Sequence, residues 1–249
     1  MVLADDLRLA LDRVAFARSL GFEPDAWQAA ALRWGGKRAL WNCSRQSGKS
    51  TTAALLAVHE ALYWPGALVL LVSPSLRQSS ELFRKAGEWL SKLPNPPSLP
   101  EDNRLSCALA NGSRIVSLPG SESTVRGFSG AALIIEDEAA RVPDNLYRAI
   151  RPMLAVSGGR LVLMSTPFGK RGHFFEEFTN GGPGWERVEV PATDVPRISA
   201  AFLEEEQASL GDMWFAQEYC CEFRETVDQV FGYDLIAAAI SADVQPLFE

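Results

Sequence analysis

Short, almost continuous apolar runs alternate with helix-like patterns along this chain. Five runs of this kind predict β-strands, at residues 37–43, 67–75, 131–136, 160–164 and 185–190. Runs that are apolar at successive positions are typical of parallel strands that are covered by helices on both faces. Residues 104–118 instead alternate around Asn111 and Gly112, a pair that favours a tight turn, and this pattern predicts a hairpin.

Between the strands, apolar residues recur every three or four positions, as they do along one face of a helix. Helices are predicted over residues 3–19, 25–34, 50–63 and 76–93, and as two segments from about residue 199 onward. Because strands and helices alternate, we expect an α/β fold with a mostly parallel central sheet and helices on both faces.

The first candidate for chemistry is the segment CSRQSGKS at residues 43–50, between a predicted strand and a predicted helix. It matches the phosphate-binding pattern G-x-x-x-x-G-K-[ST], except that Cys43 replaces the first glycine. Backbone N–H groups at the start of a helix bind anions, Lys49 has the reach for the β- and γ-phosphates, and the Ser50 hydroxyl is a suitable Mg²⁺ ligand. A chance Gly-Lys-Ser turn is the alternative that this segment leaves open by itself.

A second candidate is the apolar strand at residues 133–135, which runs directly into three carboxylates. Acidic side chains in such a place are costly unless they sit at the end of the strand and serve a cation. Asp137 suits the role of holding Mg²⁺, and Glu138 suits the general base that orients the attacking water. A solvated acidic loop is the alternative, but together with the segment at 43–50 the pattern indicates a nucleotide hydrolase.

Two further segments supply weaker candidates. Ser165 and Thr166 end another predicted strand, at the same edge of a parallel sheet, where they are placed to sense the γ-phosphate. Arg126 lies on a glycine-containing loop and is a candidate arginine finger, as is Arg45 inside the phosphate loop, and sequence spacing alone does not separate the two. Gln28, next to Trp27, has an amide that is suited to reading the adenine edge.

The residues expected to contact the nucleotide lie in the phosphate loop, at the start of the helix that follows it, and at Gln28. They are Gln28, Ser44, Arg45, Gln46, Ser47, Gly48, Lys49, Ser50 and Thr51.

Charge and composition narrow the class of protein. The 249 residues carry a net charge of −7, yet residues 1–170 hold 20 Lys and Arg against 15 Asp and Glu, whereas residues 171–249 hold 4 against 16. A mildly basic body is compatible with a polyanion partner. The candidates for contact with DNA are Arg84, Lys85, Arg104 and Arg114. No apolar run approaches the roughly 20 residues that span a bilayer, so we expect no membrane association. The four cysteines have no zinc-like spacing, so we expect a reduced, cytoplasmic protein.

Taken in order, these motifs resemble the ATPase domain of the large terminase subunit of tailed bacteriophages. The likeness rests on CSRQSGKS, IIEDEA and STPFG, with WQ upstream, RGFSG before the acidic strand, and QEYCCEF near the end. It implies the phosphate-loop ASCE type of ATPase fold, with ATP and Mg²⁺ as cofactors. The Ser-Arg-Gln form of the phosphate loop is typical of terminases, so Cys43 is a family variant. The likeness also favours Arg126 as the finger that is inserted into the neighbouring subunit's site, with Arg45 contacting phosphate in its own chain.

The resemblance further implies an assembly. Five subunits would form a ring on the viral portal, together with the small terminase subunit, and would draw double-stranded DNA into the procapsid within the bacterial cytoplasm. Residues 1–198 would form the ATPase core, and residues 199–249 a helical lid subdomain with a linker. Large terminases also carry a nuclease domain with clustered carboxylates; because the sequence ends before such a cluster, we expect no nuclease activity from this chain.

Two other functions stay open at this point. One is a helicase or restriction-type DNA translocase with the same ATPase core, which strand separation of a duplex would reveal. The other is an assembly module that binds nucleotide without turnover, and Lys49, Asp137 and Glu138 argue against it because all three groups needed for hydrolysis are present.

Overall fold

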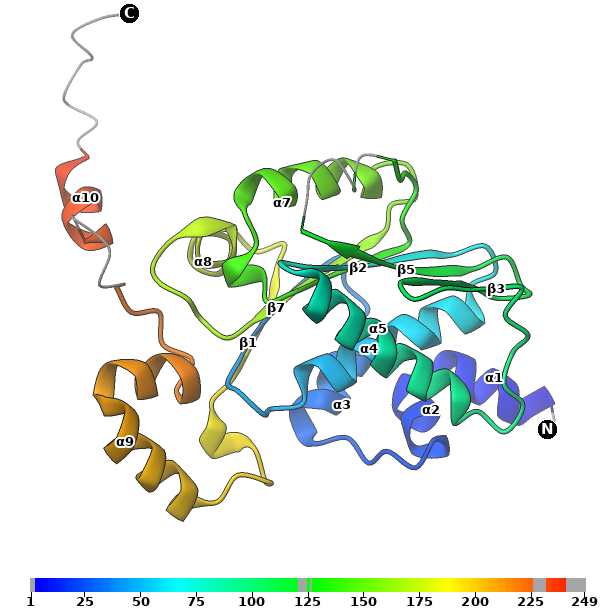
Figure 1. Ribbon diagram of the computed structural model, residues 1–249, viewed down its shortest axis with the longest axis horizontal. Helices are drawn as coiled ribbons and strands as arrows, with labels where there is room; N and C mark the ends of the chain where they lie inside the picture. Colours follow the sequence, from blue (N-terminus) through cyan, green and yellow to red (C-terminus); the bar gives the residue numbers. More distant parts are fainter. Residues whose placement is uncertain (1–2, 121–124, 126, 226–231, 241–249) are drawn as a thin grey trace, which may run out of the picture.

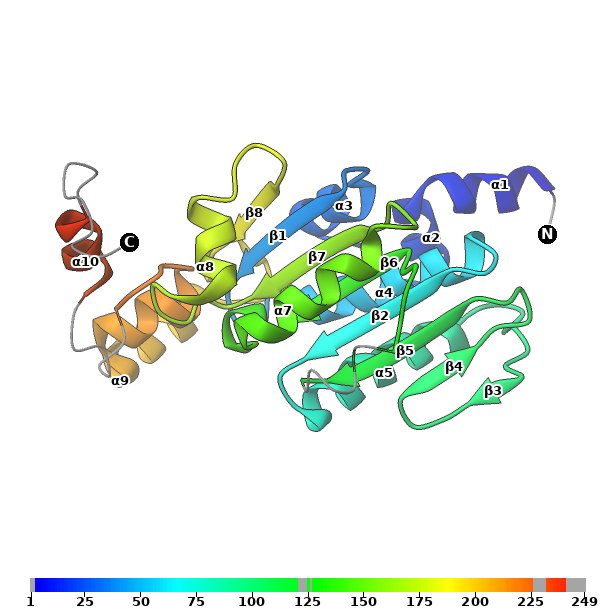
Figure 2. The ribbon, with the colours of Figure 1, turned by 90° about the horizontal axis from the view of Figure 1, so that it is seen from above.

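A central sheet of eight strands organises the computed structural model, which describes residues 3–120, 125, 127–225 and 232–240. The strand order across the sheet is β3-β4-β5-β2-β6-β7-β1-β8 (Figure 2). The strands are β1 (Arg38–Cys43), β2 (Leu68–Ser73), β3 (Glu101–Asp102), β4 (Ser106–Ala108), β5 (Arg114–Pro119), β6 (Leu133–Asp137), β7 (Arg160–Ser165) and β8 (Glu186–Val190).

The strands from β5 to β8 in this order are all parallel, and only β3 and β4 run antiparallel to their neighbours. The mostly parallel sheet that was predicted is therefore confirmed. The predicted hairpin is formed by β4 and β5, with Cys107 opposite Ile115. Gly112 lies in its turn at a φ of 83°, a left-handed conformation that glycine adopts without strain.

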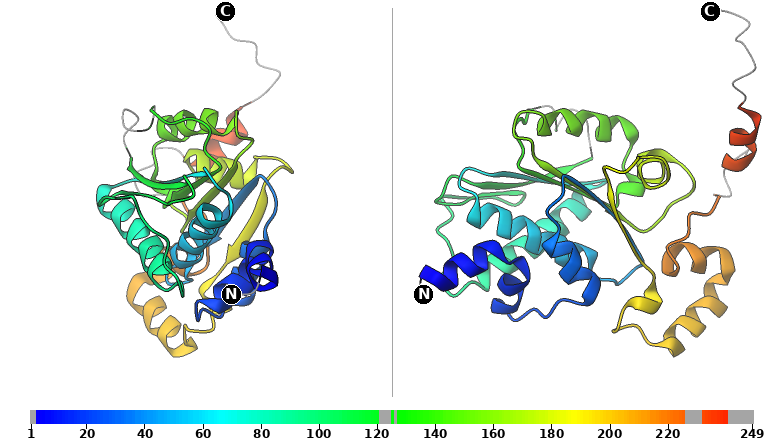
Figure 3. Two further views of the ribbon diagram at one scale, coloured as in Figure 1. Left: turned by 90° about the vertical axis from the view of Figure 1, so that its right-hand side faces the viewer. Right: turned by 180° about the vertical axis from the view of Figure 1, so that it is seen from behind.

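Helices cover both faces of the sheet (Figures 1 and 3). On one face lie α1 (Leu3–Leu11), α2 (Arg13–Ser19), α3 (Ala26–Arg33), α4 (Lys49–Tyr63) and α5 (Leu76–Ser91). On the other face lie α7 (Asp144–Ile150) and α8 (Gly172–Thr179). The described residues also form short 3-10 turns at η1 (Ala139–Arg141), η2 (Arg151–Leu154) and η3 (Ala192–Asp194), and the chain continues through α9 (Ala200–Tyr219) and α10 (Tyr233–Ala239). Across the described ranges, no helix combines the length and the apolar character needed to cross a bilayer.

Successive residues of the central strands enter two separate cores. Leu71 and Ile135 pack with α4 and α5 on one face of the sheet, whereas Leu70 and Ile134 pack with α7 on the other. Side chains of a strand point alternately to its two faces, so a strand that is buried on both faces must be apolar at every position. This explains the continuous apolar runs of the sequence.

The prediction of one helix over residues 3–19 is wrong. The chain breaks at Asp12, whose backbone is extended and whose carboxylate accepts hydrogen bonds from the N–H groups of Val14 and Ala15. Aspartate at this position caps a new helix. The apolar periodicity of the sequence did not reveal the break, since Leu3, Leu7 and Leu11 of α1 are exposed and Leu9 is its buried residue.

The long helix α9 consists of two segments, as predicted from the sequence. They meet at Gly211, where φ is 74° and ψ is 161°, values outside the helical region. Leu203 and Tyr219 pack together with Ala192 in a small cluster of their own. The division into a core over residues 1–198 and a lid over residues 199–249 stays a prediction.

Candidate functional site

Three predicted motifs meet at one edge of the sheet. In the parallel register, Asn42 at the end of β1 lies opposite Ser165 of β7, and Asp137 at the end of β6 lies opposite Met164 of β7. Since parallel strands end at the same edge, the segments that follow β1, β6 and β7 are neighbours there (Figure 2). This edge is where open parallel sheets place ligands.

The phosphate loop connects β1 to α4, which begins at Lys49. Gly48 precedes the helix with a φ of 92°, and a Cβ atom at this position would lie 2.6 Å from Nε2 of Gln28. The left-handed backbone therefore favours glycine, and a side chain here would also displace the end of the Gln28 side chain. The loop presents the N-terminus of a helix of 15 residues, an arrangement that attracts anions.

Two hydroxyls of the loop are buried without a hydrogen-bond partner. Within the described part of the chain, Oγ of Ser44 and Oγ of Ser47 make no hydrogen bond to a nitrogen or oxygen, although Ser47 lies within reach of the Cys43 thiol, and both residues are fully buried. Buried polar groups are almost always paired, so such atoms next to a helix N-terminus fit a bound polar group such as a phosphate. Ser50 and Thr51 follow on the first turn of α4, and both are half-buried.

Lys49 joins this loop to the acidic segment. Its Nζ lies 3.1 Å from Oε1 of Glu138, and the side chains are 11% and 20% exposed. Burial by itself would lower the pKa of Lys49, but the charges of Glu138 and Asp137 outweigh it and the pKa is raised. The ammonium group therefore stays charged at neutral pH.

Asp137 is the more buried of the two carboxylates at the end of β6, Asp137 and Glu138. It is 6% exposed, and its Oδ1 accepts a hydrogen bond of 3.0 Å from the N–H of Glu138. Burial raises the pKa of Asp137 to about 6, although the nearby charge of Lys49 acts in the opposite direction. A carboxylate that is this poorly solvated is stabilised when a cation approaches it.

A metal at this place would need ligands from outside the chain. Among the described residues there is no group of three or more His, Cys, Asp and Glu side chains that could hold a metal ion. Mg²⁺ in nucleotide sites is typically bound by one or two protein oxygens together with phosphates and waters. One hydroxyl at Ser50 and one carboxylate at Asp137 fit that pattern.

Gln28 lies directly behind the phosphate loop. It is 1% exposed, its Oε1 accepts a hydrogen bond from the N–H of Asp25, and its Nε2 lies 3.5 Å from the carbonyl oxygen of Ser47. Arg197 donates to the same carbonyl at 3.0 Å and to Asp25 at 2.6 Å. Gln28 and Arg197 thus both contact the phosphate loop at the carbonyl oxygen of Ser47. The recognition of adenine by Gln28 stays a prediction.

The phosphate loop is also tied to α9 through Arg45. Its Nε lies 2.6 Å from Oε2 of Glu218, and its backbone N–H donates to the carbonyl oxygen of Glu218 at 3.1 Å. Glu218 also lies 3.6 Å from Arg141, which in turn lies 3.2 Å from Oε2 of Glu138. Arg45 is therefore paired within its own chain in this structure. The other finger candidate, Arg126, lies outside the described residues.

Ser165 and Thr166 sit between the other two motifs, because β7 lies between β1 and β6. Both side chains are buried, and Oγ of Ser165 donates to the carbonyl oxygen of Thr166 at 2.6 Å. The structure thus brings these residues to the same edge as Lys49 and Asp137. Their role as sensors stays a prediction.

The four candidates for DNA contact do not form one cluster. Arg84 on α5 is paired with Glu81 at 2.6 Å and with Glu88, and Lys85 follows it. Arg114 starts β5, whereas Arg104 is exposed before β4, which runs antiparallel to β5. The two arginines therefore lie toward opposite ends of the hairpin.

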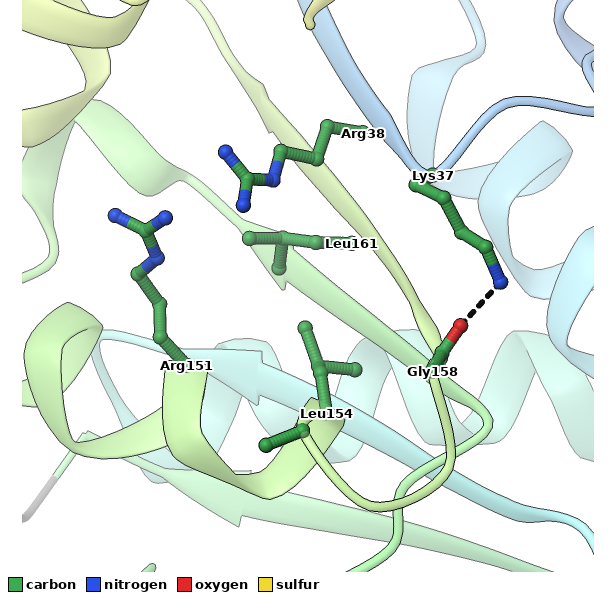
Figure 4. A pocket seen from close by; sticks show the side chains of 8 residues that line it. Lys37, Arg38, Arg151, Leu154, Gly158 and Leu161 are labelled. Carbon is green, nitrogen blue, oxygen red and sulfur yellow. Dashed lines mark hydrogen bonds between the residues drawn. The ribbon is translucent and has the colours of Figure 1, made fainter.

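A basic cavity of about 380 Å³ lies at the opposite edge of the sheet, where β1 and β7 begin (Figure 4). Lys37, Arg38 and Arg151 line it together with the apolar side chains of Leu154 and Leu161. None of the predicted site residues lines this cavity.

Three residues of the candidate site were missed by sequence reasoning, namely Arg141, Arg197 and Glu218. Arg197 and Glu218 are far from the motifs along the chain, and folding alone brings them to the phosphate loop. Arg141 follows Glu138 by one 3-10 turn, and its position three residues after a candidate base was a signal that could have been used.

Comparison with known proteins gives a consistent result. Residues 40–238 match the family described as terminase large subunit, T4likevirus-type, N-terminal. The terminase large subunits of Thermus phage G20c and Thermus virus P23-45 are each 30% identical in an alignment of 257 positions that covers 89% of this chain and 53% of theirs. The chain thus spans about half the length of the curated relatives it matches.

Solved structures of large terminases also resemble this chain. The large terminase ATPase domain of Thermus phage P74-26 superposes with a TM-score of 0.72 at 26% identity, covering 84% of this chain and 97% of that one. The large terminase of bacteriophage HK97 superposes with the same TM-score of 0.72 at 15% identity, covering 86% of this chain and 55% of that one. At that identity, the second match bears on the fold alone.

Proposed function

The chain belongs to the terminase large subunit family, and on that basis we propose that it hydrolyses ATP to drive double-stranded DNA into a viral procapsid. One observation carries the proposal above all: Lys49 of the phosphate loop lies 3.1 Å from Glu138, at the strand end that also holds Asp137. A cation for phosphate, a carboxylate for metal and a carboxylate for water thus share one place. The name of the P74-26 relative, an ATPase domain, supports the same reaction.

The nucleotide is bound by the loop and by the first turn of α4 in this proposal. The residues from Ser44 to Thr51, with Gln28 behind the loop, form the binding surface. Ser50 and Asp137 would hold Mg²⁺, which would supply positive charge to neutralise the phosphates. The unpartnered hydroxyls of Ser44 and Ser47 support this assignment, because a bound phosphate would supply acceptors for them.

Glu138 acts as the general base. Its carboxylate orients a water for in-line attack on the γ-phosphate and accepts a proton from it, while Lys49 neutralises the charge that develops on the phosphate. Ser165 and Thr166, on the strand between the two motifs, respond to the loss of the γ-phosphate and pass that change on.

Charge from a neighbouring subunit completes the site. Arg45 is already engaged by Glu218 of its own chain, which supports Arg126 as the finger that reaches a neighbour. In the assembled motor we place five subunits in a ring on the portal, with the small terminase subunit as a further partner, in the cytoplasm of a bacterial host.

Phosphate release from ATP tests the proposal on the purified chain. Glu138→Gln keeps the shape of the side chain and removes the base, so turnover should fall by roughly 10²- to 10⁴-fold while nucleotide binding is retained. The matched control is Glu205→Gln, on an exposed carboxylate of α9, which should leave turnover unchanged.

Two results would count against the assignment. A Glu138→Gln variant that hydrolyses ATP at the wild-type rate would show that the base lies elsewhere. A wild-type chain that binds ATP but releases no phosphate, alone or in the assembled ring, would identify a nucleotide-binding module without turnover.

A further inference from the structure

Arg141 touches the carboxylate that the proposed mechanism uses as its base. The 3-10 turn η1 begins immediately after Glu138, and the N–H of Arg141 donates to the carbonyl oxygen of Glu138 at 2.8 Å. The turn folds the side chain back, so that Nη1 of Arg141 lies 3.2 Å from Oε2 of Glu138. The Arg141 side chain is 27% exposed, so water screens this pair only in part.

Two other groups hold the Arg141 guanidinium. Its central carbon lies 4.4 Å from the centre of the Phe168 ring, in the loop that follows Ser165 and Thr166. Its Nη2 lies 3.6 Å from Oε1 of Glu218 near the end of α9. Arg141 thus contacts the strand end with the base, the loop after β7 and α9 at once.

Glu218 is shared between two arginines. Its side chain is 9% exposed, and its second oxygen lies 2.6 Å from Nε of Arg45 in the phosphate loop. A buried carboxylate needs such partners, since an unpaired buried charge is costly. Glu218 therefore fixes the positions of both guanidinium groups.

The two oxygens of Glu138 have different partners, Lys49 at Oε1 and Arg141 at Oε2. A general base needs one oxygen directed at the water and a contact that keeps the carboxylate from rotating. When Lys49 turns to phosphate oxygens, Oε1 is released and Arg141 remains as the contact that orients the carboxylate. Arginine suits this task because its planar guanidinium holds two carboxylates in fixed directions.

We propose that Arg141 is a positioning residue for the Glu138 carboxylate and that Glu218 holds Arg141 in place. The inference rests on the proposed function, because it assigns Arg141 a part in the same hydrolysis. It also links α9 to the base through two side chains.

The test compares turnover with nucleotide binding in the variant Arg141→Ala. We expect kcat for ATP hydrolysis to fall by about 10- to 100-fold, a part of what general base catalysis contributes, while KM and the Kd for a non-hydrolysable ATP analogue change less than about 3-fold. Ethylguanidinium added at a non-denaturing concentration should restore part of the kcat of Arg141→Ala. The kcat of Arg141→Lys should lie below that of the wild type. The control is Arg148→Ala on α7, an exposed arginine that should leave both quantities unchanged.

Wild type and Glu138→Gln are measured in parallel, so that two failures can be told apart. If wild type is no faster than Glu138→Gln, the proposed function fails. If wild type is faster but Arg141→Ala matches it, the positioning role is overturned. It is equally overturned if Arg141→Ala weakens analogue binding and leaves kcat intact, since Arg141 would then be a nucleotide contact.

A double-mutant cycle tests the part of Glu218. Glu218→Gln should lower kcat in the wild-type background and have a clearly smaller effect in the Arg141→Ala background, because its influence passes through Arg141. An equal loss in both backgrounds would show that Glu218 acts independently of Arg141, and would remove the link from α9 to the base.

Discussion

The ammonium nitrogen of Lys49 lies 3.1 Å from Oε1 of Glu138, and this contact joins the loop after β1 to the turn after β6. Both side chains are mostly buried, so each charge depends on the other for its stabilisation. The stability of the fold and the chemistry proposed for the chain therefore depend on the same pair of groups.

The first prediction concerns the energy of that pair. Lys49→Met should lower the free energy of unfolding by about 1–3 kcal/mol, because the Glu138 carboxylate is left with Arg141 as its remaining partner. The double variant Lys49→Met/Glu138→Gln should recover part of that loss. Urea unfolding of the four proteins measures the coupling; strictly additive effects would show that the two charges do not interact.

A second prediction concerns the backbone of the phosphate loop. Gly48→Ala places a Cβ at a φ of 92° and within 2.6 Å of Gln28, so unfolding free energy should fall by roughly 1–3 kcal/mol and ATP affinity should fall with it. Gly87→Ala is the matched control, because this glycine lies inside α5 with no atom within 4 Å of the added Cβ. It should stabilise the protein by about 0.4–1 kcal/mol. Thermal and urea unfolding of both variants decide the point, and a neutral Gly48→Ala would contradict it.

A third prediction is a loss of stability in acid that originates at His59. Burial lowers the pKa of His59 to about 4, and the neighbouring charges of Arg13 and Arg160 act in the same direction, although a hydrogen bond to Leu9 opposes them. A histidine whose pKa is lower in the folded state keeps its full contribution above the ordinary value of 6.5 and loses it as the pH falls toward 4.

The loss attributable to His59 between about pH 7.5 and pH 4.5 is about 2 kcal/mol. His59→Gln has no titrating ring and can still donate to the carbonyl oxygen of Leu9, so its unfolding free energy should depend less on pH over that range. Equal slopes for wild type and variant in urea titrations would rule out His59 as the source.

A fourth prediction separates the two finger candidates. In the assembled ring, Arg126→Ala and Glu138→Ala should each lose activity, and a mixture of the two should regain part of it, because each subunit lends the other what it lacks. The gain in the rate of ATP hydrolysis should be large, since an arginine finger in trans raises that rate by about 10³- to 10⁵-fold. Mixing Arg126→Ala with the double variant Arg126→Ala/Glu138→Ala is the control that cannot complement. If mixing with Glu138→Ala rescues Arg45→Ala but does not rescue Arg126→Ala, the finger is Arg45.

A fifth prediction concerns DNA. Lys85→Ala and Arg104→Ala should weaken duplex binding and reduce the salt dependence of the binding constant by about one counterion each. Arg84→Ala should have a smaller effect, because Glu81 and Glu88 already neutralise Arg84. The double variant Lys37→Ala/Arg38→Ala, in the basic cavity at the other edge, is the control. If that variant alone weakens binding, the duplex lies at the opposite edge of the sheet.

The sequence predicted those features of the fold that depend on residues close together along the chain. Gly48 and Lys49 follow a strand and open a helix, and Asp137 and Glu138 end an apolar run, so their neighbours in sequence already identify their places in the sheet. The break at Asp12 was missed because the apolar periodicity continues through it while the carboxylate caps a new helix.

Other features depend on contacts between distant segments and left no local signal. Glu218 stands in a helix whose surroundings in the sequence resemble any acidic helical face, and only the folded chain brings it to Arg45. Arg197 likewise meets the carbonyl of Ser47 through the fold alone. The short helices α7 and α8 have seven and eight residues, too few turns for a clear apolar repeat.

The backbone of the phosphate loop also depends on late parts of the chain: the N–H of Ser44 donates to the carbonyl oxygen of Val190, and the N–H of Arg45 to that of Glu218. During synthesis on the ribosome the loop therefore emerges long before the groups that fix its shape. We therefore expect the loop to reach this shape only after the segment around Glu218 has been made.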